Sequence, residues 1–203
     1  MYKPTDVGPG DEREGMDQDL VLRAQKGDRQ AFETLALQSH DRLQRVAVGI
    51  LRDPHLAEDA VQQALLGIWR DIRGLRDPAR FDGWSYKLLV RICYAEAKRK
   101  PNWTSDENVP EAREPVAADD YDAIAHRDQL ERAFARLSVD HRAVVVLHRL
   151  KGMPLDQVAE VLEVPVGTVK SRLSRAMEGL RAALEADGRR EPEPGQPVRQ
   201  EVV

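Results

Sequence analysis

The amino-acid sequence predicts an all-α protein made of two small helical domains, and three observations lead to this fold class. Apolar residues recur at spacings of three and four over most of the chain, which is the period of an amphipathic helix. Aromatic residues make up only 5% of the 203 residues, and strand-favouring runs are short, which disfavours a β-sandwich or a β-barrel. Two basic segments flank an acidic, proline-containing segment, and this change of composition marks a flexible linker between two domains.

The first predicted domain, residues 17–100, has the pattern of a helical bundle. Asp28 can cap a helix whose apolar side chains recur every three or four residues. Asp53 followed by Pro54 marks the next helix, because proline suits the first helical position after a capping aspartate. Asp82 can cap a further helix, which follows a loop and must end near the next proline. The predicted apolar stripe of that helix is Trp84, Leu88, Ile92 and Ala95.

Three segments lack the apolar periodicity of a folded element, and we expect them to be disordered or flexible. The N-terminus, residues 1–16, is acidic and polar, and the tail, residues 187–203, is rich in proline. The linker, residues 101–122, is strongly acidic, with seven Asp and Glu residues against one Arg. The second domain, residues 123–186, resumes the helical pattern.

The second domain contains the spacing of a helix-turn-helix, which completes the predicted fold class. Residues 155–162 and the stretch from Val169 onward have helical periodicity, and about four residues, Glu163 to Val166, join them. Arg can form paired hydrogen bonds with guanine edges, and Thr, Ser and Lys can bind phosphates or bases. This pattern favours DNA binding, and the alternative is an ordinary amphipathic pair with a solvated charged face. The candidate DNA-facing residues are Thr168, Lys170, Ser171, Arg172 and Arg175.

The first domain carries a basic segment with interleaved aromatic side chains. Residues 70–100 hold nine Lys and Arg residues against four Asp and Glu, and five of the ten aromatic residues lie between Phe81 and Trp103. Aromatic rings beside cations form a stacking platform for unpaired bases, at about 1–3 kcal/mol per base. The alternative is that Trp84 and Tyr94 fill the core while the basic side chains are solvated. The coincidence of both features beside a loop bounded by Gly and Pro favours single-stranded nucleic acid.

Several other classes of protein are disfavoured. No stretch of eighteen apolar residues exists and the N-terminus has no apolar signal core, so we expect a cytoplasmic protein without membrane insertion. Cys93 is the single cysteine, which excludes an internal disulfide, and we expect it to be buried and inert. The acidic pairs Glu58–Asp59 and Asp119–Asp120 do not converge with histidines at metal-ligand spacing. We therefore predict no enzymatic activity, no metal and no cofactor.

Two longer segments resemble the extracytoplasmic-function (ECF) sigma factors of bacterial RNA polymerase. The first is HLAEDAVQQALLGIWRDIRGLRDPARFDGWSYKLLVRICYAEAKR, residues 55–99, and the second is LSVDHRAVVVLHRLKGMPLDQVAEVLEVPVGTVKSRLSRAMEGLR, residues 137–181. The string GTVKSRLSRA is a strong signal in that family, and EDAVQQALLGIW stands at the right separation from it. The resemblance covers both predicted domains, from about residue 19 to 100 and from 123 to 184.

The resemblance implies a protein that binds core RNA polymerase, recognises the −35 promoter element as duplex DNA, and captures a flipped base of the melted −10 element. The residues at the family's polymerase-binding positions are Asp59, Gln62, Gln63, Leu66 and Trp69. The candidates for −10 contact are Arg80, Phe81, Trp84, Tyr86, Lys87 and Arg91. The candidates for −35 contact are the helix-turn-helix residues named above. An anti-sigma factor is implied as a further partner.

Two positions depart from the family pattern. Arg91 stands where the family often has Asn, which leaves the base preference at the −10 element open. Pro165 stands where Ser often caps the DNA-reading helix, which weakens that cap by about 1 kcal/mol. The residues by themselves also allow a conventional helix-turn-helix regulator whose first domain is a sensor or dimerisation module. The two alternatives differ in whether the first domain contacts polymerase and single-stranded DNA.

Overall fold

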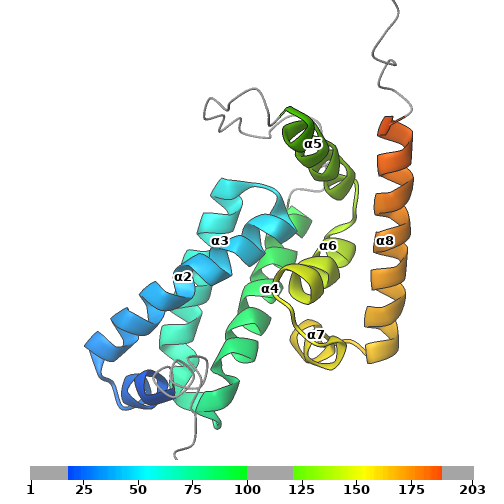
Figure 1. Ribbon diagram of the computed structural model, residues 1–203. Coiled ribbons are helices and arrows are strands. Elements are labelled where there is room, and N and C mark those ends of the chain that lie inside the picture. The colour runs from blue at the N-terminus through cyan, green and yellow to red at the C-terminus, as the bar shows by residue number, and fades with distance from the viewer. Residues whose placement is uncertain (1–17, 100–120, 189–203) are drawn as a thin grey trace, which may run out of the picture.

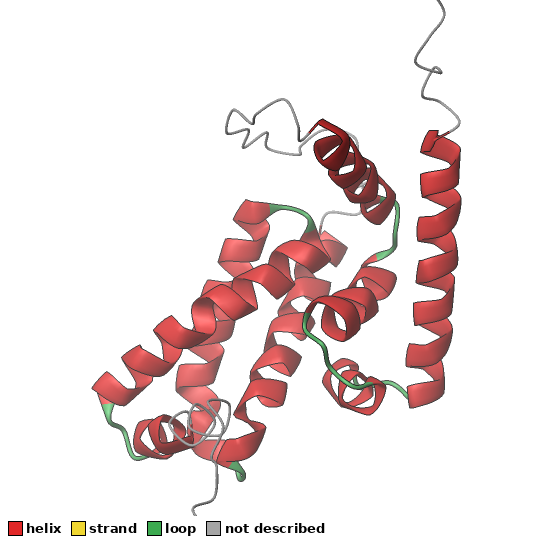
Figure 2. Cartoon of the chain, in the orientation of Figure 1, coloured by secondary structure: helices red, strands yellow, loops and turns green. Residues whose placement is uncertain are grey.

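The computed structural model describes residues 18–99 and 121–188, and both stretches consist of helices and short turns (Figure 1). The described residues contain no strand (Figure 2), so the predicted all-α fold class is confirmed. The predicted linker and the two predicted disordered ends lie almost wholly outside the described residues. A helix nevertheless begins at Tyr121, inside the predicted linker, and the last helix runs to Gly188, inside the predicted tail.

The first half of the chain is a bundle of three long helices that follow a short one over residues 18–25. Figure 1 shows the three long helices packed side by side, and α3 contacts both of the others. The elements are α2 (Arg29–Leu51), α3 (Pro54–Asp71), the 3-10 turns η1 (Ile72–Gly74) and η2 (Pro78–Arg80), and α4 (Phe81–Arg99).

The second half of the chain is made of shorter helices and one long terminal helix. The elements are α5 (Tyr121–Ala135), α6 (Val139–Val145), the π-helical segment η4 (Val146–Leu150), α7 (Leu155–Leu162) and α8 (Val166–Gly188). Residues 163–165 join α7 to α8, so the predicted helix-turn-helix spacing is confirmed.

Two of the three predicted helix starts in the first half are confirmed. The Asp28 carboxylate accepts a hydrogen bond from a first-turn amide at 3.1 Å, and the Asp53 carboxylate accepts two, at 2.9 and 3.1 Å. The third prediction is wrong, because α4 begins at Phe81, directly after η2, and Asp82 lies inside its first turn. The Asp82 carboxylate forms an ion pair with Arg42 of α2 instead.

The buried side of α4 also differs from the predicted stripe. The predicted residues Trp84, Leu88 and Ile92 are only half-buried, and Ala95 is exposed. The buried residues of α4 are Phe81, Ser85, Tyr86, Leu89, Val90 and Cys93. The stripe is offset because α4 is covered on two sides, by α2 and α3 of its own bundle and by α7 of the second half.

The hydrophobic core is continuous across the two halves of the chain. Buried apolar side chains form one cluster that runs from Leu20 to Val169, through α2, α3, α4, α6, η4 and α7. Helix α7 packs on α4, while α6 and η4 pack on α2 (Figure 1). A smaller cluster joins α5 to α8 and consists of Ala133, Leu137, Val145, Ala176, Leu180 and Ala183. The two predicted domains therefore lie against each other in this structure.

Gly49 allows the close approach of α2 to η4. A Cβ atom on Gly49 would lie 2.8 Å from Cγ2 of Val146, which is too close for two carbon atoms. Because Val146 is β-branched and buried, its side chain has little freedom to move aside. The absence of a side chain at this one helical position therefore determines how tightly the two halves pack.

Among the helices that the structure describes, none combines the length and the apolar character that crossing a membrane requires.

Candidate functional site

Helix α3 presents a mixed polar and apolar face to solvent. Its buried residues are Ala57, Ala60, Val61, Ala64 and Ile68. The predicted polymerase-binding residues all lie on the exposed side of this helix: Asp59, Gln62, Gln63, Leu66 and Trp69. Leu66 is 70% exposed and Trp69 is 44% exposed, and adjacent large apolar side chains at this exposure are typical of an interaction surface.

An apolar groove of about 650 Å³ runs along this face between α2 and α3. Phe32 of α2 and Leu65, Leu66 and Trp69 of α3 supply its apolar lining. The Trp69 ring is tilted against the Phe32 ring, with the centroids 4.6 Å apart, so the exposed indole is held in place. The groove therefore offers a partly pre-organised site for an apolar side chain of a partner.

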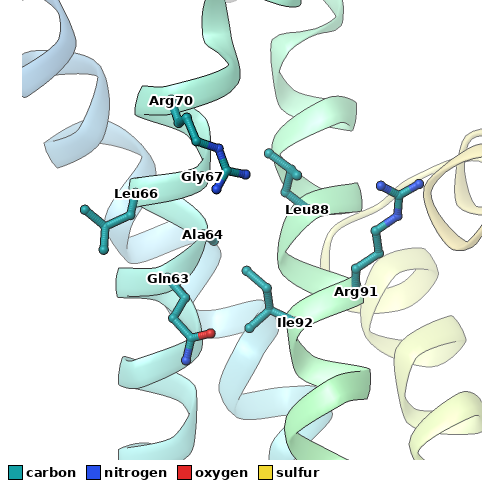
Figure 3. A pocket seen from close by; sticks show the side chains of 8 residues that line it. All are labelled: Gln63, Ala64, Leu66, Gly67, Arg70, Leu88, Arg91 and Ile92. Carbon is teal, nitrogen blue, oxygen red and sulfur yellow. The ribbon is translucent and has the colours of Figure 1, made fainter.

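A second groove, of about 520 Å³, lies between α3 and α4 (Figure 3). Ala64, Gly67, Leu88 and Ile92 are among its lining residues, and Arg70 of α3 extends across it toward Leu88 of α4 (Figure 3). Among the described residues, a Cβ atom at Gly67 would meet nothing within 4 Å, so the groove is open there. An apolar floor with a guanidinium at its rim suits a planar, polar-edged group such as a nucleobase.

The predicted −10 residues fall into two groups. Phe81 and Tyr86 are 3% and 0% exposed, so neither ring presents a face on which a base could stack. The ammonium group of Lys151, from the second half of the chain, lies 5.4 Å from the Tyr86 ring centroid. Arg80, Trp84, Lys87 and Arg91 are exposed or half-buried. We call these four residues the −10 surface.

Two cations of the −10 surface are bound by one carboxylate of the helix-turn-helix. Lys87 Nζ lies 2.8 Å from Glu163 Oε1, and Arg91 donates two hydrogen bonds, of 2.8 and 2.6 Å, to Glu163 Oε2. These hydrogen bonds from Lys87 and Arg91 lower the pKa of the Glu163 carboxyl. Glu163 is the C-cap of α7 and has a left-handed backbone conformation, with φ of 55°. It was not predicted as a site residue, because it lies more than seventy positions after Lys87 and Arg91 and no local pattern links it to them.

Helix α8 exposes part of the predicted −35 surface. Lys170, Ser171 and Arg175 are exposed, and Thr168 is half-buried. Arg172 is turned toward α6, where its guanidinium lies 3.3 Å from the Asp140 carboxylate and its side chain is only 23% exposed. The opposite side of α8 is buried through Val169, Ala176, Leu180 and Ala183.

Pro165 offers no side-chain cap to α8, as predicted from its residue type. Its carbonyl oxygen accepts hydrogen bonds from the amides of Thr168 and Val169, at 2.8 and 3.2 Å, and these bonds begin the helix. The amides near this helix start lie next to the exposed Lys170 and Ser171. The start of α8 can therefore approach a phosphate group.

Tyr94 of α4 is a second point of contact between the two halves of the chain, close to candidate DNA-binding residues. It lies beside Asp140 and Arg172, and burial, followed by the Asp140 carboxylate, raises the pKa of its phenol. Both −10 and −35 candidate residues are thus close to the contact between α4 and the second half.

Two buried groups stand apart from these surfaces. Arg142 is 5% exposed, and burial, with a contribution from the nearby Arg52 guanidinium, lowers its pKa to about 10. Cys93 is fully buried, as predicted, and burial raises the pKa of its thiol to about 12. Within residues 18–99 and 121–188, no group of His, Cys, Asp and Glu side chains could hold a metal ion.

The structure combines an exposed apolar face on a helical bundle with a helix-turn-helix that has basic residues on its second helix. Residues 35–102 match the family model of Sigma-70 region 2, and residues 127–180 match that of Sigma-70, region 4. The region 2 match precedes the region 4 match along the chain, and together they cover more than half of it.

Curated proteins with similar sequences indicate which group of sigma factors this chain resembles. The chain is 33% identical over 181 residues to the ECF RNA polymerase sigma factor SigM of Mycobacterium tuberculosis, which covers 88% of this chain and 89% of the relative. It is 27% identical over 186 residues to the RNA polymerase sigma-H factor of Pseudomonas aeruginosa, which covers 83% and 94%. The chain belongs to the ECF sigma factors, the promoter-recognition subunits of bacterial RNA polymerase. This family is a class of transcription factors and not of enzymes.

Solved structures share the fold. CnrH, solved in complex with the cytosolic domain of CnrY, aligns with a TM-score of 0.60 at 24% identity and covers 85% of this chain and 99% of its own. The sigma factor RpoE of Bartonella quintana, solved with the anti-sigma factor NepR, aligns with a TM-score of 0.57 at 22% identity. That alignment covers 77% of this chain and 98% of RpoE.

Proposed function

We propose that this sigma factor docks on core RNA polymerase through the exposed face of α3, recognises the −35 element with α8, and holds the opened −10 strand on α4. It acts in the cytoplasm and contributes binding and not catalysis. The main support for the proposal is the pair of exposed residues Leu66 and Trp69 beside an apolar groove. The same chain also contains a helix-turn-helix with basic residues on its second helix.

The α3 face has the composition of a protein interface. Large apolar side chains at the centre of an interface carry most of its binding energy, and polar neighbours determine its orientation. Leu66 and Trp69 supply the apolar centre, and Asp59, Gln62 and Gln63 supply hydrogen-bonding groups around it. We expect a helical partner surface, because a groove between two helices accepts side chains from a third helix.

The α8 surface supports recognition of duplex DNA. The second helix of a helix-turn-helix enters the major groove with its N-terminal half. That half of α8 carries the exposed residues Lys170, Ser171 and Arg175. Arg175 is the candidate for base recognition, while Lys170 and Ser171 suit phosphate contact. Arg172 joins them only if it releases Asp140.

The α4 surface supports capture of an opened strand. Extruding a base from the duplex costs a few kcal/mol, which stacking and phosphate contacts must offset. Trp84 is only half-buried, so part of its indole remains available to a base, and Arg80, Lys87 and Arg91 offer charge for the backbone. The groove between α3 and α4, beside Arg91, is the candidate pocket for the extruded base.

An anti-sigma factor is the further partner that we propose. The RpoE structure that shares this fold was solved with such a factor. The same apolar α3 face that docks on polymerase would suit an inhibitor that competes for it.

Run-off transcription on genomic DNA fragments, with core polymerase and the full chain, tests the proposal. We expect defined transcripts that require both components. Leu66→Ala should reduce them strongly, whereas Leu130→Ala should not, because Leu130 is a 50% exposed leucine on α5, outside the proposed face. Transcription that does not depend on the added protein, or equal activity of the two variants, would contradict the proposal.

A further inference from the structure

The contact between α4 and the helix-turn-helix places the two proposed DNA-binding surfaces against each other. Helix α7 packs on α4 through apolar side chains of the shared core. At the edge of this contact, Glu163 binds Lys87 and Arg91. We call the arrangement with α7 packed on α4 the closed form. In the closed form, Glu163 of the helix-turn-helix covers part of the −10 surface.

The Glu163 carboxylate occupies the position that a DNA phosphate would need. Each of its oxygens accepts from one of the two cations, Oε1 from Lys87 and Oε2 from Arg91. A phosphate group of an unpaired strand would be bound by the same two donors in the same way. Carboxylate and phosphate therefore exclude each other at this site.

In the closed form, the two proposed DNA-binding surfaces also lie too close together to reach both promoter elements at once. Positions −10 and −35 are 25 base pairs apart, or about 85 Å at about 3.4 Å per base pair along the helix axis. In the structure, Glu163 touches the −10 surface and lies three residues before the start of α8. Helix α8 itself has 23 residues and spans about 35 Å. Simultaneous recognition requires that the α4–α7 contact open.

We infer that Glu163 is an internal latch: a phosphate-mimicking carboxylate that holds the helix-turn-helix on α4 and competes with promoter DNA for Lys87 and Arg91. The inference rests on the proposed function for the identity of the displaced ligand. The latch would make the free protein inhibit its own DNA binding, because Glu163 occupies part of the −10 surface until polymerase and DNA separate the two halves.

The local structure supports a releasable contact. The side chains of Lys87, Arg91 and Glu163 are 34%, 58% and 45% exposed, and ion pairs at such exposure are weak and screened by salt. A helix C-cap in the left-handed region usually has Gly or Asn. Glu163 has φ of 55° there, so a backbone position that disfavours glutamate nevertheless carries the carboxylate.

Zero-length cross-linking tests whether the latch is closed in the free protein. A carbodiimide activates the carboxylate, and the amine of Lys87 then displaces it as a urea, which leaves an amide bond between Lys87 and Glu163. We expect mass spectrometry of the full chain to detect this linked peptide pair, and its loss in Lys87→Arg, which keeps the charge but has no amine. A free protein without this link would overturn the inference.

Binding to a fluorescent single-stranded 20-mer of mixed sequence tests the competition. Glu163→Gln should raise the affinity of the full chain about three- to fivefold, which is within the range expected for the loss of weak, exposed ion pairs. Glu160→Gln is the matched control, because Glu160 is exposed on the same helix and the change in net charge is the same. It should have no such effect.

A variant with unchanged net charge distinguishes the effect of separating the two halves from the effect of removing the Glu163 charge. Gly49→Gln places a side chain against Val146 in the closed form and leaves net charge unchanged. It should also raise single-strand affinity and reduce the cross-link. A gain confined to Glu163→Gln, or a gain in neither variant, would overturn the inference.

Failure of the proposed function gives a different pattern. In that case the link forms and both variants bind the single strand more tightly, but core polymerase and the protein give no defined transcript.

Discussion

Replacing Trp69 by Ala removes the largest exposed apolar side chain of the α3 face. Trp69 is 44% exposed, and a tryptophan has up to about 250 Å² of surface, so about 110 Å² remains for a partner to cover. At about 25 cal/mol per Å², covering this area contributes about 2.7 kcal/mol, which is about 100-fold in the dissociation constant for core polymerase.

A fluorescently labelled full chain titrated with core polymerase measures this dissociation constant by anisotropy. Because the Trp69 ring also contacts Phe32, thermal unfolding of the variant must be measured alongside. Leu66→Ala is the second variant: Leu66 is 70% exposed, and its loss should weaken binding by about 1.5 kcal/mol, or about 10-fold, with little effect on the fold.

Leu130→Ala, on α5, serves as the control for loss of an exposed apolar side chain. A change of less than about threefold in both Trp69→Ala and Leu66→Ala, with the fold intact, would refute the assignment of the α3 face. Equal losses in these variants and in Leu130→Ala would refute it as well.

Three further predictions concern other parts of the molecule. Arg175→Ala should lower affinity for a cognate −35 duplex by about 1–3 kcal/mol, measured by electrophoretic mobility shift, whereas Arg181→Ala, an exposed arginine further along the same helix, should have little effect. Arg142→Met should raise the free energy of unfolding by about 1–2 kcal/mol in urea titrations, because a desolvated guanidinium is replaced by an apolar side chain of similar size; a decrease would show that the cation is compensated. The thiol of Cys93, with a pKa of about 12, should react with Ellman's reagent at pH 8 only after unfolding; rapid reaction of the native protein would contradict its burial.

Structural features that depend on a few neighbouring residues could be predicted from the amino-acid sequence. Asp28 and Asp53 cap helices because a capping interaction involves only the next few residues. The exposed face of α3 follows from the apolar period of one helix, so Leu66 and Trp69 were placed correctly on the surface.

Features that depend on distant residues could not be predicted in this way. Phe81 and Tyr86 lie in a basic, aromatic segment, but α4 is covered on two sides, so both rings are buried. Asp82 has the residue type of an N-cap, yet Arg42 of α2 binds its carboxylate. The Glu163 contact joins residues more than seventy positions apart, and neither partner carries a local signal of it.

The most direct test of the central claim is to map promoter opening and protection in one complex. With core polymerase and the full chain, we predict nuclease protection around −35 together with permanganate-reactive thymines around −10, and neither the protein nor the core should open the DNA alone. Protection of duplex DNA by the protein without core, and no reactive thymines when core is added, would contradict the account and would instead indicate a conventional helix-turn-helix regulator.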